Sequence, residues 1–259
     1  MTVRAHRFFP LLAAVALGLS VTLMGGNQAT AAESPVGLGT AASFAVLGGS
    51  TVINTGPSVI SGDVGLSPGT AISGFPPGTV NGGTIHATDA VAAQAQADVT
   101  TAYNDAAGRS TSATVTADLG GQTLVPGVYT GPTLALTGTL TLDAQGDPNA
   151  VFVFQTASTL TTASASAVNL VNGASPCNVY WQVGTSATLG TDSTFVGTVL
   201  ALTSVTAATD ATITGRLFAR NAAVTLDTNT IDSSTCAAAT TTTGPAAPSP
   251  VAATPNFTG

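Results

Sequence analysis

Lysine is absent from this 259-residue chain, and its five arginines are set against twelve acidic residues. Charged residues make up only 7% of the sequence and aromatic residues 5%. Proteins that bind nucleic acid neutralise phosphates with clustered lysine or arginine, and no such cluster is present. We therefore exclude nucleic acid as a partner and assign the acidic excess to keeping an otherwise neutral surface soluble.

Histidine is almost as scarce, since His86 is the only one beyond the first ten residues. It follows Thr84 and Ile85 directly before a predicted helix, where a turn role accounts for it. Asp143 and Asp147 lie in a loop with glycine and proline, a setting that permits weak calcium binding but fits a turn better. We predict no metal site, no cofactor and no catalytic residue.

Residues 1–32 have the features of a secretory signal peptide. Arg4 and Arg7 precede an apolar run over residues 11–23, and Ala29-Thr-Ala31 fits a cleavage site. A membrane anchor is the alternative, but the run is short and interrupted by glycine. We expect an extracellular protein, and no later stretch is long and apolar enough to cross a membrane.

Cys177 and Cys236 are the only cysteines. An exported protein meets an oxidising environment, so a disulfide between them is the favoured interpretation. Two free thiols and a metal pair are weaker alternatives, because a metal site needs three or four ligands and no histidine lies nearby in sequence.

A short pattern of valine, leucine, alanine, glycine and threonine repeats over residues 151–230. Its clearest step is 18 residues, from Gly197 to Gly215, and this step places Thr188 on Thr206. A fixed period of this length with short strands and no room for a helix predicts a solenoid of stacked β-coils. In such a stack we expect Thr156, Thr185 and Thr203 to form one row, and Thr159, Thr188 and Thr206 another.

Residues 89–107 break this pattern. Apolar residues recur there at steps of four and three, which predicts an amphipathic helix with Thr88 or Asp89 as N-cap and Gly108 as its end. Its predicted buried row is Val91, Ala95, Val99, Ala102 and Ala106. Because this row is mostly alanine, we expect the helix to lie closely along one flat face of the solenoid, over Tyr180 and Trp181.

Three regions follow from composition. The signal peptide occupies residues 1–32, the folded domain residues 33–236, and a tail of alanine, threonine and proline residues 237–259. The tail lacks apolar residues to bury, so we expect it to be disordered.

Eight segments of the domain resemble the secreted ice-binding protein family of cold-living microbes. They are VGLGTAASFAVL from residue 36, SGDVG from 61, GFPPGTV from 74, DAVAAQAQAD from 89, DLGGQTLVPGVY from 118, CNVYWQVG from 177, GRLFARN from 215 and VTLDTNTI from 224. The segments occur in order over residues 36–236.

The resemblance implies a mainly β fold, a right-handed discontinuous β-helix of triangular section. One long helix lies alongside, and the first coil docks against the last. It also implies an ice-binding (antifreeze) function through one flat face that carries the pattern Thr-Ala/Gly-x-Thr/Asn. Complete or partial matches supply the predicted ice-binding residues Thr70, Thr156, Thr159, Thr185, Thr188, Thr203, Thr206, Thr209, Thr225 and Thr228. The predicted partner is an ice surface, with no membrane contact and a monomeric protein.

Two other functions stay open at this point. A non-catalytic adhesin or surface-coat module could use the same scaffold, and threonine is in any case a good strand residue. A polysaccharide-acting β-helix enzyme is the weaker alternative, because it needs clustered carboxylates or a poised basic residue.

Overall fold

The computed structural model describes residues 33–236. The predicted signal peptide (1–32) and tail (237–259) lie outside these residues. Within the described part of the chain, no helix combines the length and apolar character that a bilayer crossing requires.

Short parallel strands stack in layers with three faces, which we call a, b and c. Face b is a separate seven-stranded sheet, whereas faces a and c share a fifteen-stranded sheet. They share it because β18 (Thr194–Ala201) and β20 (Thr212–Ala219) run from face c into face a. Each bends at a glycine with positive φ, Gly197 or Gly215, and the space beside Gly215 is filled by the backbone of Gly197.

Each face is a ladder of strands that follow one another in space rather than in chain order. Face a contains β8 (Ala113–Thr114), β10 (Gly127–Thr130), β13 (Phe152–Thr156), β16 (Val179–Val183), the second halves of β18 and β20, β1 (Phe44–Gly48), β4 (Asp63–Leu66) and β7 (Ile85–Ala87). Face b contains β11 (Leu134–Leu136), β14 (Leu160–Thr162), β17 (Ala187–Leu189), β19 (Val205–Ala207), β21 (Val224–Asp227), β2 (Thr51–Thr55) and β5 (Ala71–Ser73). Face c contains β9 (Thr123–Leu124), β12 (Thr139–Asp143), β15 (Ala167–Val171), the first halves of β18 and β20, β22 (Thr230–Asp232), β3 (Val59–Ser61) and β6 (Thr79–Asn81).

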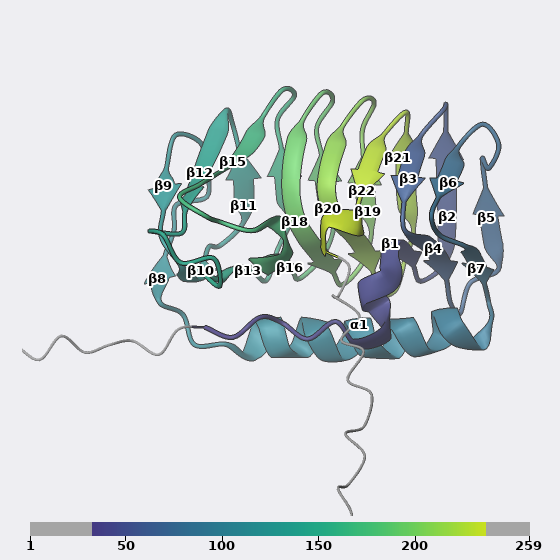
Figure 1. The fold of residues 1–259 in the computed structure, drawn as a ribbon, viewed down its shortest axis with the longest axis horizontal. Helices are drawn as coiled ribbons and strands as arrows, with labels where there is room; N and C mark the ends of the chain where they lie inside the picture. The colour runs from purple at the N-terminus through teal and green to yellow at the C-terminus, as the bar shows by residue number, and fades with distance from the viewer. Residues whose placement is uncertain (1–32, 237–259) are drawn as a thin grey trace, which may run out of the picture. The chain divides into compact units, whose positions relative to one another are not determined.

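The stack is discontinuous in chain order, as expected. β1 pairs with β20 on one side and β4 on the other, so the N-terminal coils dock against the C-terminal coil. The helix α1 (Ala90–Gly108) then carries the chain back along face a to β8 (Figure 1). From β8 the chain winds through the remaining layers until it meets its own beginning.

The helix confirms the predicted segment. The side chain of Asp89 caps it by accepting a hydrogen bond from the N–H of Ala92 at 2.8 Å. The prediction for Val91 was wrong: it is 48% exposed, and Ala92 in the first turn and Gln96 in the second are buried instead. The amide of Gln96 donates to the carbonyls of Gly48 and Ala219, a polar tie that an apolar-periodicity argument does not detect.

Apolar side chains form two cores, one inside the stacked layers and one between face a and α1. Tyr180 lies in the core under the helix, as expected. Trp181 does not: it points into the stack, where its ring stacks on Phe154 at 4.1 Å between centroids and tilts against Phe195. Neighbouring residues of a strand point to opposite faces, so only one of this pair can face the helix.

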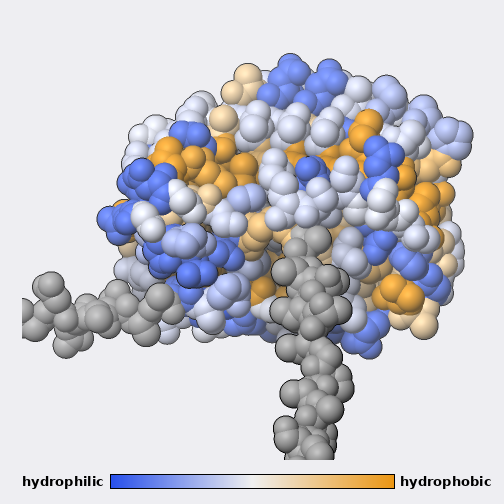
Figure 2. Space-filling view, in the orientation of Figure 1, coloured by the Kyte–Doolittle hydropathy of each residue, from blue (hydrophilic) through white to orange (hydrophobic). Residues whose placement is uncertain are grey.

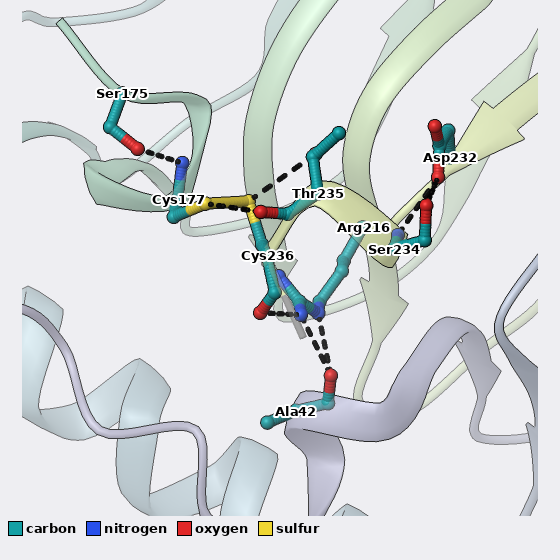
Figure 3. Close-up of a disulfide and its surroundings, with 8 residues drawn as sticks. All are labelled: Ala42, Ser175, Cys177, Arg216, Asp232, Ser234, Thr235 and Cys236. Atoms are coloured by element: carbon teal, nitrogen blue, oxygen red, sulfur yellow. Dashed lines mark hydrogen bonds between the residues drawn. A yellow bond between two sulfur atoms is a disulfide. The ribbon is translucent and has the colours of Figure 1, made fainter. Parts of the chain in front are cut away.

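The seam between the chain's beginning and end is fastened at the corner of faces a and c (Figure 3). The predicted disulfide joins Cys177 and Cys236 and so ties the 3-10 turns η2 (Pro176–Asn178) and η3 (Ser234–Cys236) together. Beside it, Arg216 donates hydrogen bonds to the carbonyls of Ala42, in η1 (Gly39–Ser43), and Cys236.

Candidate binding faces

Face b carries a row of outward threonines at its centre. Each of its strands alternates, so that Leu160, Ala187, Val205 and Val224 point inward and the next residue points outward. The parallel register places the outward residues one above another in adjacent layers. We call the set Thr161, Thr188, Thr206 and Thr225 the b column. It continues through Ile53, which pairs with Thr225 and is 41% exposed.

The hydroxyls of the b column are available to form hydrogen bonds with water or with a ligand. Within residues 33–236, none of the four forms a side-chain hydrogen bond. The row beside it behaves differently. There the hydroxyls of Thr133 and Thr159 pair at 3.1 Å, and those of Ser186 and Ser204 at 2.8 Å. Face b thus places a row of unpaired hydroxyls and methyls beside a row that is internally satisfied.

The centre of face b carries no charge among the described residues. Asp227 lies at the end of β21, where the strand turns toward face c, and its carboxylate accepts hydrogen bonds from the hydroxyls of Thr209 and Thr228. These two threonines therefore belong to the corner rather than to the open face. A neutral, regularly spaced surface suits a neutral, periodic ligand.

Most predicted ice-binding residues lie on face b or at its edges. Thr159, Thr188, Thr206 and Thr225 are on the face, Thr185 and Thr203 precede it at the corner with face a, and Thr70 directly precedes β5. Thr156 is a correction. It is 1% exposed, and its hydroxyl donates to the carbonyl of Pro132 and accepts from the N–H of Ser158.

The predicted rows were partly wrong. The strand register pairs Thr156 with Val183, and Thr185 stacks on Ser158, so Thr156 does not share a row with Thr185 and Thr203. Thr159 stacks on Ser186, and Thr161, which sequence analysis missed, takes the place beside Thr188.

Aligning the layers on the glutamine near the end of β13 and of β16 would have predicted the position of Thr161. Gln155 pairs with Gln182, which sets a step of 27 residues between these layers, whereas matching the Thr-x-x-Thr pattern implied a step of 29. Residues two apart point the same way in a strand and residues three apart do not, so the two threonines of one such pattern cannot both point outward from the same strand.

The remaining candidate side chains make local contacts within the fold, and the predicted turn position of His86 was wrong, because this residue lies in β7. Asp143 accepts from the side-chain amide of Asn172 and the N–H of Gln145, and these hydrogen bonds hold its pKa below the ordinary value. His86 contacts Asp89 at 2.7 Å at the start of α1. In the part of the chain that the structure describes, no three histidine, cysteine or acidic residues gather as a metal site would require.

The chain is similar to known proteins in sequence and in fold. The chain is 56% identical over 197 residues to an ice-binding protein of Nostoc sp. (strain HG1), covering 75% of this chain and 72% of that protein. An ice-binding protein from an Antarctic biological consortium has a crystal structure that superposes with a TM-score of 0.77 at 53% identity, over 78% of this chain and 93% of the other. The ice-binding protein of the Antarctic ascomycete Antarctomyces psychrotrophicus superposes with a TM-score of 0.74 at 44% identity, over 77% and 98% of the two chains.

The family model for ice-binding-like proteins matches residues 46–232, which is nearly the whole of the three-faced stack. This chain therefore belongs to the ice-binding-like family.

Proposed function

We propose that this protein is an extracellular antifreeze protein that adsorbs to ice through face b as a monomer, without catalysis. The b column supplies the central contacts, and Thr159, Thr185, Thr203 and Thr70 extend them toward the edges. Membership of the ice-binding-like family and the names of the relatives support the function. The observation that favours this face is the uncharged row of stacked threonines with unpaired hydroxyls.

The physical basis is a match between two periodic surfaces. Adjacent layers repeat at about 4.8 Å, a spacing close to an oxygen repeat of ice. The threonine methyls hold water in a cage while the hydroxyls anchor it by hydrogen bonds, so an ordered layer forms that can merge with the lattice. The strands are rigid, so little conformational entropy is lost, and many weak contacts act together. Adsorbed protein makes the ice front curve between molecules, which opposes its growth.

The test is thermal hysteresis and crystal habit for the wild-type protein and a Thr206→Tyr variant. Tyrosine at the middle of the b column adds a ring that holds neighbouring side chains away from the lattice. We expect the wild-type protein to facet ice and widen the freezing gap, and the variant to lose most of that gap. The matched control is Thr101→Tyr. Thr101 is an exposed residue of α1, the helix that packs on face a, and it is not part of face b.

A wild-type protein that leaves ice crystals round would contradict the proposal and move the adhesin function forward. Equal hysteresis in Thr206→Tyr and Thr101→Tyr would instead remove the role of the b column. Circular dichroism spectra of all three proteins establish that each variant remains folded.

A further inference from the structure

Face c carries a second row of threonines that resembles the b column. Thr194, Thr212 and Thr230 pair in register through β18, β20 and β22, and Thr139 joins them one layer beyond Ala167. We call Thr139, Thr194, Thr212 and Thr230 the c column. It continues through Val59, which is 38% exposed, and Thr79.

The c column has the surface properties that carried the argument for face b. All four of its threonines are exposed, whereas Thr206 and Thr225 of the b column are half-buried. Among residues 33–236, none of its four hydroxyls forms a side-chain hydrogen bond. Both rows also pass through a β-branched aliphatic residue from an N-terminal coil, Ile53 on face b and Val59 on face c. A hydroxyl residue follows in the next layer, Ser73 on face b and Thr79 on face c.

Charge is absent from this row too. The acidic side chains of face c are Asp143 and Asp232, at the strand ends near face a rather than in the c column. Figure 1 shows β18, β20 and β22 on the near side of the stack, and in Figure 2 much of that side is white or pale, as small neutral residues are. The α1 helix covers face a only, so it leaves the c column open.

The corner between faces b and c is built to be rigid. Each successive layer turns there through one residue in the left-handed conformation: Ala165, Asp192, Asp210 and Thr228, with φ between 55° and 60°. The backbone stacks through this corner as well, since the N–H of Asp192 donates to Thr209 and that of Asp210 to Asp227. The two rows therefore keep one fixed orientation relative to each other in every layer.

We propose that face c is a second ice-binding surface, separate from face b. This inference rests on the proposed function. Because the two faces meet at a corner, one molecule cannot lay both flat on a single crystal plane. The protein therefore adsorbs to two sets of ice planes, one through each face.

The test is adsorption of fluorescently labelled protein to a single-crystal ice hemisphere, which displays the bound planes as separate patches. Four variants are compared with the wild-type protein: Thr206→Tyr on face b, Thr212→Tyr on face c, the double variant, and Thr101→Tyr as the control. We expect each single face variant to lose a different set of patches and to keep the other. The double variant loses both sets, and the control keeps both.

The outcomes separate the two proposals. If the wild-type protein leaves the ice unlabelled, the proposed function itself fails. If the wild-type protein labels ice but Thr212→Tyr gives the control pattern, or if Thr206→Tyr alone removes every patch, face c is not an ice-binding surface. Thr230→Tyr, one layer along the same column, must repeat the result of Thr212→Tyr. A thermal melt of each variant confirms that a lost patch reflects the face and not the fold.

Discussion

Arg216 is an arginine held inside the protein by carbonyl groups alone. It is 2% exposed, and no carboxylate among the described residues lies within ion-pair distance of it. Its guanidinium donates to the carbonyl of Ala42 at 2.7 and 3.1 Å and to that of Cys236 at 2.9 Å. Burial lowers the pKa of Arg216 and raises that of the nearby Tyr180. One side chain thus joins the first turn of the domain to its last.

We predict that Arg216→Met destabilises the domain. Hydrogen bonds from a charged donor contribute about 1.5–3 kcal/mol each. Methionine has no donor, so the carbonyls of Ala42 and Cys236 both lose this hydrogen bond. A net loss of about 3 kcal/mol lowers the melting temperature by roughly 10 °C for a domain of this size. Differential scanning calorimetry measures the shift.

The matched control for this variant is Arg220→Met. The Arg220 guanidinium lies over the ring of Tyr103 at 4.7 Å and is only half-buried, so its removal has a smaller effect. Equal melting temperatures for the two variants would show that the bridge between Ala42 and Cys236 adds nothing.

Polar side chains attach the helix to the rest of the domain at fixed points, in addition to the apolar core beneath it. Gln96 donates to two strand carbonyls, Gln155 to the last turn of α1, and Gln182 to the hydroxyl of Tyr103. At the middle of α1, Asp98 accepts hydrogen bonds from the N–H and the hydroxyl of Thr40 at 2.7 Å each, which fixes η1 against α1. Most of the buried side chains of α1 are small alanines, so these hydrogen bonds help to fix its position on the domain.

Asp98 makes the attachment of α1 sensitive to acid. Its hydrogen bonds from Thr40 lower its pKa below the ordinary value of 3.8. A group whose pKa is lowered by folding stabilises the fold above that ordinary value, and the contribution disappears as the pH falls through the folded pKa. We expect the melting temperature to decline more steeply with acid below pH 3.8 in the wild-type protein than in Asp98→Asn.

Thermal melts over a pH series give both slopes. The control is Asp210→Asn, at an exposed aspartate for which the structure gives no side-chain hydrogen bond. If Asp98→Asn retains the wild-type slope, another carboxylate governs the acid response.

Elements differ in how well the sequence predicts them. The 18-residue step was confirmed by the pairing of Gly197 with Gly215 and of Thr188 with Thr206, because those two layers have loops of equal length. The earlier layers contain longer loops, at residues 144–151 and 172–178, and there the register had to come from strand residues such as Gln155. Face c was missed for a related reason. The 18-residue step aligns Thr194 with Thr212, but each follows a Thr-Asp pair where the pattern supplied by the resemblance requires Thr-Ala or Thr-Gly.

At the scale of the whole domain, the disulfide ties the turn after the C-terminal coil to the loop before β16. Cys177 and Cys236 are 59 residues apart in sequence, and their bridge sits at the corner of faces a and c, away from face b. In the chain-entropy model, a disulfide that closes a loop of this length stabilises the folded state by about 4 kcal/mol, because it restricts the unfolded chain.

We predict that the double variant Cys177→Ser/Cys236→Ser melts at a clearly lower temperature but still shapes ice in the cold. The loss of about 4 kcal/mol corresponds to roughly 10 °C or somewhat more for a domain of this size. Thermal hysteresis near the freezing point should match the wild-type value, because face b is unchanged. Loss of hysteresis in a variant that is folded at that temperature would show that the bridge shapes the binding face.

The docking of the first coils on the last has a consequence for synthesis. β1 needs β20 as its neighbour, and the two are joined by nearly the whole length of the domain. Contacts between such distant segments close late and slow the folding of β-rich chains. One edge of β1 in the nascent chain has no partner strand from the time β1 leaves the ribosome until β20 has been made. Because β20 protects that edge from other copies and is made near the end of the domain, this fold is most exposed to aggregation when incomplete chains are crowded together.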